Sequence, residues 1–235
     1  MQTDAATVQG ELERALAQIT GEPVRVIGAG RTDAGVHATG QVISFRTATE
    51  LDGERLGRGV NALLPADIAI SAPEPVEDGF HARFSATGRT YEYRIRNGPR
   101  RDPLERHREH WLPRPLDIAS IERATEEIVG RRDFSAFAVG DGGVREVRRA
   151  AWSAAGELLR FEITANAFLR GMVRAIVGSL IWVGSGKITP DDLRAIIASG
   201  RRSTAGPSAP AEGLCLIGVE YDGRQQKMRI EDSDE

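Results

Sequence analysis

The segment between residues 28 and 40 carries the residue types best suited to chemistry in this chain. Its sequence, GAGRTDAGVHATG, places four glycines around four polar side chains, Arg31, Thr32, Asp33 and His37. Glycine has no Cβ, so a backbone rich in it can approach a ligand closely. Loops of this kind often hold functional residues. A carboxylate held there, that of Asp33, could serve as a nucleophile or a base.

Two other interpretations of this glycine-rich loop (residues 28–40) compete with a catalytic carboxylate. A dinucleotide fingerprint needs G-x-G-x-x-G at the start of a helix, and a Walker loop ends in G-K-[ST]; neither is present. An aspartic-protease-like pair would need a second copy of Thr-Asp-Ala-Gly, which the chain lacks. The commonest role for a single loop aspartate is a local turn, and composition alone leaves that role open for Asp33.

Hydrophobic spacing and turn residues predict interleaved helices and strands around this loop. In the first part of the chain we expect helices over residues 8–20 and 52–64 and strands over 24–27, 41–46 and 67–72. Prolines and acidic residues indicate a domain boundary near residue 80. Beyond it we expect strands over 89–96, 146–153, 158–165 and 214–221 and helices over 118–129, 167–183 and 190–199. Short loops and hairpins favour antiparallel pairing, which predicts an α+β fold.

The composition excludes several classes of protein. The 31 basic and 34 acidic residues nearly cancel to a net charge of −3, so a uniformly basic nucleic-acid coat is not indicated. Cys215 is the single cysteine, which excludes a disulfide framework and a cysteine-rich zinc module. The four histidines lack zinc-ligand spacing. Without a readable signal peptide or membrane span, we expect a cytoplasmic protein.

Several blocks of sequence, taken in order, resemble the TruA family of tRNA pseudouridine synthases. They are GRTDAGVHA with the following GQ, NALLP, FHARFSA, RTYEY, DFSAF, NAF, MVR and EGL. Together they span about residues 8–221, and chance agreement over so many ordered blocks is very improbable. The resemblance implies two ferredoxin-like or RRM-like halves whose mainly antiparallel sheets meet around a central cleft.

The resemblance also implies an activity and a domain plan. The activity is isomerisation of uridine to pseudouridine in the tRNA anticodon stem-loop, at positions 38–40, by a homodimer with no cofactor or metal. We expect an N-terminal domain over residues 1–80 that carries the glycine-rich loop, a C-terminal domain over 81–222 and an acidic, disordered tail over 223–235. The family's additional strand before the first helix has no counterpart here, which predicts an unpaired sheet edge in the first domain.

Three residues match the family's catalytic set. Asp33 matches the catalytic aspartate, which attacks C1′ or uracil C6 or acts as a base on the sugar. Burial would raise the pKa of such a carboxyl, so it needs a cation nearby. Arg174 is the only charge between Gly171 and Val183 and matches the family's partner arginine; the alternatives are an arginine on the helix's exposed stripe, with Arg170 one turn earlier, or a partner for some other acid. Tyr91 matches the tyrosine that stacks on the extruded uracil, with Tyr93 as the fallback.

A further set of residues is expected to bind the substrate: Arg31, Thr32, His37, Gln41, Arg83, Tyr93, Asn166 and Leu214. Between residues 89 and 110 seven arginines face four acids, which suits a phosphate backbone or, equally, a solvated loop. An alternative function is a non-catalytic tRNA-binding or folding protein on the same scaffold. A small-molecule glycosidase is disfavoured because no second carboxylate is placed.

Overall fold

The computed structural model describes residues 7–71, 73–222 and 224–226. The chain forms two compact units, one made of residues up to 30 with 42–85, the other of residues 31–41 with 86 onward. The predicted domains placed the glycine-rich loop in the first half, whereas residues 31–41 pack with the second unit. Of the predicted disordered tail, residues 224–226 form a short strand, and the remainder lies outside the described residues.

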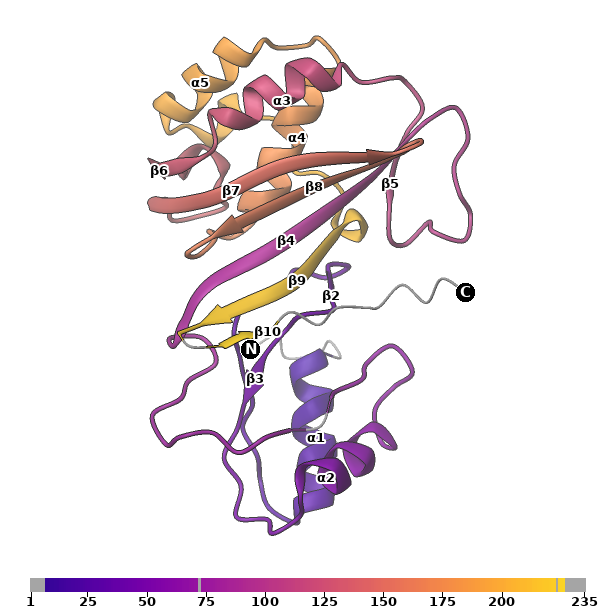
Figure 1. Ribbon diagram of the computed structural model, residues 1–235, viewed down its shortest axis with the longest axis vertical. Coiled ribbons are helices and arrows are strands. Elements are labelled where there is room, and N and C mark those ends of the chain that lie inside the picture. The colour runs from indigo at the N-terminus through magenta and orange to yellow at the C-terminus, as the bar shows by residue number, and fades with distance from the viewer. Residues whose placement is uncertain (1–6, 72, 223, 227–235) are drawn as a thin grey trace. The chain divides into compact units, whose positions relative to one another are not determined.

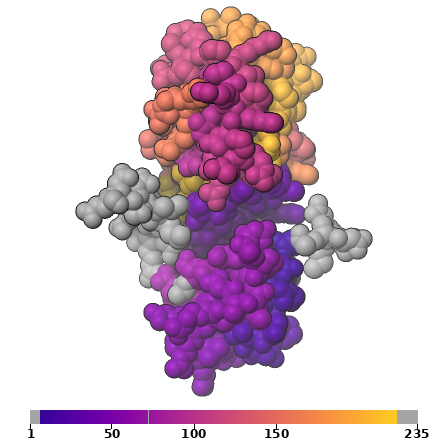
Figure 2. Space-filling view, turned by 90° about the vertical axis from the view of Figure 1, so that its right-hand side faces the viewer, coloured from indigo at the N-terminus to yellow at the C-terminus, as the bar shows by residue number. Residues whose placement is uncertain are grey.

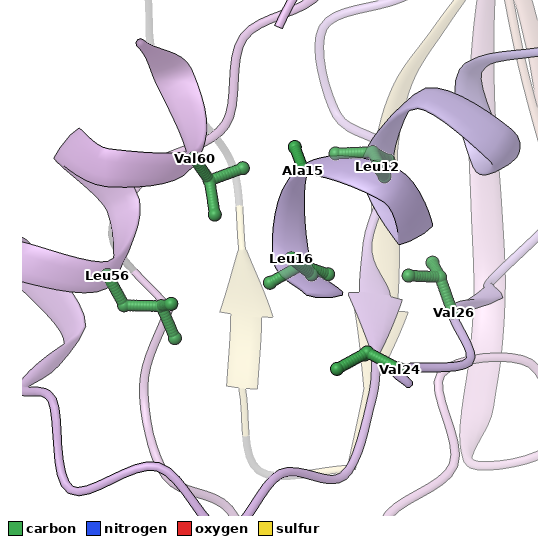
Figure 3. Close-up of a cluster of buried hydrophobic side chains, with 7 residues drawn as sticks. All are labelled: Leu12, Ala15, Leu16, Val24, Val26, Leu56 and Val60. Atoms are coloured by element: carbon green, nitrogen blue, oxygen red, sulfur yellow. The ribbon is translucent and has the colours of Figure 1, made fainter. Parts of the chain in front are cut away.

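The first unit is built around one small hydrophobic core. Its elements are α1 (Val8–Thr20), β1 (Ile27–Gly28), β3 (Ile43–Ser44) and α2 (Gly53–Asn61), with β1 and β3 antiparallel. The Thr7 side chain caps α1 by accepting a hydrogen bond from the Gly10 amide, and Gly21 ends the helix at φ 75°. Figure 3 shows the buried side chains of the two helices and the segment before β1, namely Leu12, Ala15, Leu16, Val24, Val26, Leu56 and Val60.

The strand predicted for residues 67–72 is not found over the described residues 67–71. There the Asn61 side chain forms the hydrogen bonds to the Ile70 backbone that a neighbouring strand would otherwise form. Its amide nitrogen donates to the Ile70 carbonyl and its oxygen accepts from the Ile70 amide, both at 2.8 Å. Because the side chain satisfies these backbone groups locally, the segment runs as a loop.

The second unit contains an eight-stranded, mostly antiparallel sheet, which confirms the α+β class. Its strands are β2 (His37–Ala38), β4 (Ala86–Asn97), β5 (His110–Leu112), β6 (Gly130–Asp133), β7 (Val144–Ala155), β8 (Leu158–Ala165), β9 (Leu214–Tyr221) and β10 (Arg224–Gln226). Their order is β10-β9-β4-β8-β7-β6. The two parallel pairings join β2 to β9 and β5 to β4. The pairing of β2 with β9 joins the glycine-rich loop to this sheet.

Three helices lie together on one side of this sheet, as Figure 1 shows. They are α3 (Ile118–Glu126), α4 (Met172–Gly184) and α5 (Pro190–Ser199). The alternating residues Tyr91, Tyr93 and Ile95 of β4 are all buried, in keeping with the two-residue period of a strand. Among the described residues no helix is long and apolar enough to cross a membrane.

The central helix, α4, starts later than predicted. Residues 167–171 are irregular, and the helix begins at Met172 after Gly171, whose φ of 71° is left-handed. Backbone in that conformation cannot continue a right-handed helix. The late start leaves residues 166–171 as a connection that runs past the side chains of the candidate site.

Candidate active site

The glycine-rich loop is fixed to the sheet at its C-terminal end. His37 pairs with Cys215 and Ala38 with Leu216, and the amides of Thr39 and Gly40 both donate to the Leu216 carbonyl at 3.0 Å. A Cβ on Gly40 would stand 2.3 Å from the backbone oxygen of the next residue of β9, Ile217. Only glycine fits this close approach, so the glycine here serves the docking of the loop.

Asp33 lies in a tight turn of the same loop. The Val36 amide donates to the Asp33 carbonyl at 3.1 Å, and Gly35 adopts a φ of 82°. The Asp33 side chain remains 39% exposed, so solvent or a ligand can reach its carboxylate. The turn thus leaves the Asp33 carboxylate open to solvent, while the hydrogen bond from the Val36 amide fixes the Asp33 backbone.

The predicted partner of this carboxylate is in contact with it. Arg174, in the first turn of α4, places its Nη1 3.0 Å from Asp33 Oδ2, and its side chain is 22% exposed. Its Nε donates to the Ala209 carbonyl at 2.7 Å, and the Ala209 amide donates to the Arg174 carbonyl at 2.9 Å. The guanidinium is therefore oriented by two acceptors at once, a carboxylate and a backbone carbonyl.

Tyr91 of β4 lies near this pair. It is 8% exposed, and burial raises the pKa of its phenol to about 12. The nearby Arg89 cation opposes that rise, while the negative charge of Asp33 adds to it. The Phe168 ring meets the Tyr91 ring edge-on, with centroids 5.2 Å apart and planes at 89°. Phe168 belongs to the NAF block but not to the predicted site. Its contact with Tyr91 joins residues far apart in the sequence, which no local pattern predicts.

Asn166 and Arg89 hold the irregular segment before α4, residues 166–171, in place. The buried Arg89 side chain donates through Nη1 to the carbonyls of Ala86 and Asn166, at 3.1 and 3.0 Å. The Asn166 side-chain oxygen accepts from the amides of Glu146 and Ala167. The predicted substrate-binding residue Asn166 thus fixes local backbone with the oxygen of its amide group.

Two other predicted substrate-binding residues are buried. Leu214, the first residue of β9, is 5% exposed, and Tyr93 is completely buried. The Tyr93 hydroxyl donates to the Pro210 carbonyl at 2.9 Å, and burial raises the pKa of this phenol far above its usual range. The Tyr93 side chain is therefore turned to the interior of the unit.

The remaining predicted residues occupy different surroundings. Arg31 and Thr32 are exposed, Gln41 is half-buried, and His37 Nε2 lies within hydrogen-bond distance of the His107 carbonyl. Arg83 belongs to the first unit, where its guanidinium lies 5.6 Å from the centre of the Phe84 ring. Within the second unit, the exposed Arg31 and Thr32 directly precede Asp33 in the chain.

The seven arginines between residues 89 and 110 divide into two groups. Three are held internally: Arg89 as described, Arg94 by Glu92 and Arg96 by Glu109. The other four, Arg100, Arg101, Arg106 and Arg108, are exposed on the long connection between β4 and β5. Figure 1 shows this connection as a wide excursion beyond the end of β4, and Figure 2 shows it at the surface of its unit. Its outer surface is therefore cationic.

Comparison with known proteins places these features in a family. A family model described as tRNA pseudouridine synthase matches residues 1–85 and 124–222. The chain belongs to the tRNA pseudouridine synthase family. It is similar to tRNA pseudouridine synthase A of Acetivibrio thermocellus, at 43% identity over 94% of this chain and 92% of that protein. The enzyme of the same name from Neisseria gonorrhoeae is 43% identical over 92% of this chain and 83% of its own length.

A third relative, tRNA pseudouridine synthase A of Bacillus velezensis, is 41% identical over 94% of this chain and 92% of that protein. The family membership makes this chain an enzyme of the isomerase class. Within the part of the chain that the structure describes, no group of three or more metal-ligating side chains is found. The chemistry available at the site is that of Asp33, Arg174 and the aromatic pair formed by Tyr91 and Phe168.

Proposed function

We propose that this enzyme converts uridine to pseudouridine in the anticodon stem-loop of tRNA, at positions 38–40, with Asp33 as its catalytic carboxylate. One observation carries the proposal: the partly exposed Asp33 carboxylate is paired at 3.0 Å with Arg174, in the same unit as Tyr91. The family membership supports tRNA as the substrate. The choice of the anticodon stem-loop rests on the resemblance of the sequence blocks to the TruA family.

The reaction breaks the bond between ribose C1′ and uracil N1 and forms a bond between C1′ and uracil C5. The proton on C5 leaves and N1 gains one, so the product is an isomer of the substrate. A carboxylate can attack C1′ or uracil C6, or take a proton from the sugar, and Asp33 has the exposure that each route needs. The Arg174 guanidinium, with Nη1 3.0 Å from Asp33 Oδ2, orients that carboxylate.

The aromatic pair supplies a surface for the uracil once it leaves the RNA stack. Stacking on an aromatic ring offsets part of the unstacking cost, which is a few kcal/mol. Because the pKa of Tyr91 is raised to about 12, its phenol is neutral near pH 7. This favours stacking and hydrogen-bond donation by Tyr91 over action as a tyrosinate base.

The four exposed arginines of the connection between β4 and β5 would contact the phosphates of the RNA. His37 touches this connection through the His107 carbonyl, which links it to the glycine-rich loop. We further propose that the enzyme acts in the cytoplasm as a homodimer, in line with its resemblance to the TruA family. A second copy would extend the cationic surface of a chain whose net charge is −3.

The test is pseudouridine formation in an anticodon stem-loop RNA with uridines at positions 38–40, located by chemical mapping. We expect product with the wild type, none with Asp33→Ala, and wild-type product with Asp67→Ala, which removes an exposed carboxylate of the first unit. Binding without any product from the wild type would favour a non-catalytic RNA-binding protein. Product at uridines elsewhere in full-length tRNA would contradict the proposed position.

A further inference from the structure

Residues 205–210, here called the strap, run along one side of α4 in close contact with it. A Cβ on Gly178 of α4 would stand 1.7 Å from the Pro207 carbonyl oxygen, so the backbones touch there. The Gly206 amide also donates to the Ser179 hydroxyl at 2.8 Å. Ser179 and the strap residues Ala205, Gly206 and Ala209 are buried, while Pro207 is exposed, so one side of the strap packs on α4 and the other side meets solvent.

The strap is hydrogen-bonded to Arg174, the arginine that pairs with Asp33. Ala209 exchanges two hydrogen bonds with Arg174: it accepts from the guanidinium Nε and donates to the main-chain carbonyl. A guanidinium is planar with a fixed fork of donors, so anchoring Nε sets the direction in which Nη1 points. The position of one strap carbonyl therefore determines how Arg174 faces Asp33.

The residue next to Ala209 is held by Tyr93 of β4. The Tyr93 hydroxyl donates to the Pro210 carbonyl at 2.9 Å, and its ring is completely buried. Pro210 has no amide hydrogen, so its carbonyl is its one main-chain hydrogen-bonding group. A Cβ on Gly213 would stand 2.7 Å from Tyr93 Cζ, which shows how closely the chain after the strap packs on this ring.

We propose that Tyr93 is a positioning residue that acts through the strap on Arg174, and so on the alignment of Asp33. The connection runs from the Tyr93 hydroxyl to Pro210, from Ala209 to Arg174 Nε, and from Arg174 Nη1 to Asp33. Tyr93 does not touch the substrate in this assignment. The role of Asp33 in it rests on the proposed function, whereas the effect of Tyr93 on Arg174 does not.

The first test measures that effect without any reaction. In protein labelled with ¹⁵N-arginine, the Nε–H signal of Arg174 is assigned by its loss in Arg174→Lys, and its hydrogen exchange is measured. Tyr93→Phe keeps the ring and removes the hydroxyl, and we expect about fivefold faster exchange. The control is Thr125→Val, which removes a buried hydroxyl of α3 bonded to Ile121 and Trp152. Equal exchange in wild type and Tyr93→Phe would overturn the proposal.

The second test is kinetic. Tyr93→Phe should lower kcat about tenfold with little change in KM, the cost of one lost hydrogen bond, while Thr125→Val keeps the wild-type kcat. In an Arg174→Lys background, which has no Nε fork to orient, Tyr93→Phe should change kcat less than twofold. Full additivity of the two substitutions, or a loss confined to KM, would count against the proposal. If the wild type makes no pseudouridine, the exchange experiment still decides it.

A second variant guards against a general packing defect at Tyr93. Arg202 holds the strap from its other end, donating through Nη1 to the Gly206 carbonyl at 2.8 Å and through Nη2 to the Ser208 hydroxyl at 3.3 Å. Arg202→Lys leaves the ring of Tyr93 untouched. We expect it to speed exchange at Arg174 Nε in the same direction; unchanged exchange in Arg202→Lys would exclude the strap as the link.

Discussion

The Asp33 carboxylate and the Arg174 guanidinium are 141 residues apart in the chain and meet at 3.0 Å. Both belong to the second unit, one on the loop that pairs through β2 with β9 and the other on the first turn of α4. Partly exposed ion pairs contribute only about 0–1 kcal/mol to stability. The value of this pair is therefore the orientation it gives the carboxylate.

Replacing Arg174 by lysine keeps a positive charge but removes the donor fork. We expect kcat to fall about 10- to 100-fold, because a hydrogen bond to a charged group contributes about 1.5–3 kcal/mol. The melting temperature should change little. Steady-state kinetics and thermal unfolding measure the two effects, with Arg123→Lys on the exposed side of α3 as the matched control. Wild-type kcat in Arg174→Lys would show that charge alone suffices.

The edge-on contact between Phe168 and Tyr91 predicts a role for the phenylalanine. Such aromatic pairs contribute about 0.5–1.5 kcal/mol beyond the area they bury. Phe168→Leu should therefore lower kcat/KM about two- to tenfold, while Phe45→Leu, in the first unit, should not. If kcat/KM is the same in Phe168→Leu and wild type, the ring is not part of the working site.

The raised pKa of Tyr91 predicts a loss of stability in alkali. Its pKa rises from the usual 10.0 to about 12 in the folded chain. Folding thus favours the protonated phenol. The contribution of this group to the free energy of unfolding is complete below pH 10 and is lost as the pH rises toward 12. The full loss corresponds to roughly 3 kcal/mol. Denaturant unfolding between pH 9 and 12 should show a weaker pH dependence in Tyr91→Phe.

The half-buried Tyr221 provides the comparison for that experiment, since its pKa is also raised to about 12 by burial. Its greater exposure should make the effect of Tyr221→Phe smaller. An unchanged alkaline slope in Tyr91→Phe would mean that the phenol is solvated in solution.

Much of the fold follows from local patterns. The helix at residues 8–20 is bounded by Thr7 and Gly21, the two kinds of cap that the sequence makes visible. Two predicted elements differ from the structure, one because of a side-chain contact and one because of a local backbone conformation. The β-rich run at 67–71 forms no strand because Asn61 already satisfies Ile70, and α4 begins late because of the left-handed Gly171.

For the site, the resemblance to the TruA family implies that Arg174 pairs with Asp33, and the two side chains meet at 3.0 Å; the position of Arg174 as the only charge between Gly171 and Val183 does not by itself name its partner. The sequence could not separate Tyr91 from Tyr93, because residues two apart in a strand share a face. What separates them is the hydrogen bond from the Tyr93 hydroxyl to the Pro210 carbonyl of the strap, and no local pattern connects residues 93 and 210. The same reason kept Phe168 out of the predicted site.

Docking of the glycine-rich loop on β9 makes Gly40 sensitive to substitution. In Gly40→Ala the added Cβ would stand 2.3 Å from the Ile217 carbonyl oxygen, so the loop must move. A displacement of about 1 Å near a reacting group can cost roughly 100-fold in rate, and we expect a loss of that size. Gly218→Ala is the matched control, because a Cβ there meets nothing within 4 Å. Similar kcat values for the two variants would contradict this account of the loop.

The exposed arginines at 100, 101, 106 and 108 predict how binding depends on salt. Each phosphate contact contributes roughly 0.7–0.9 to the slope of log binding constant against log salt concentration. Replacing all four by glutamine should therefore flatten that slope by up to about 3 and weaken binding at low salt, with kcat nearly unchanged. Arg194→Gln, which removes an α5 arginine paired with Glu127, should leave the slope as it is. Titration of the stem-loop RNA at several salt concentrations measures the slope, and an equal slope in the quadruple variant and wild type would place the phosphate contacts elsewhere.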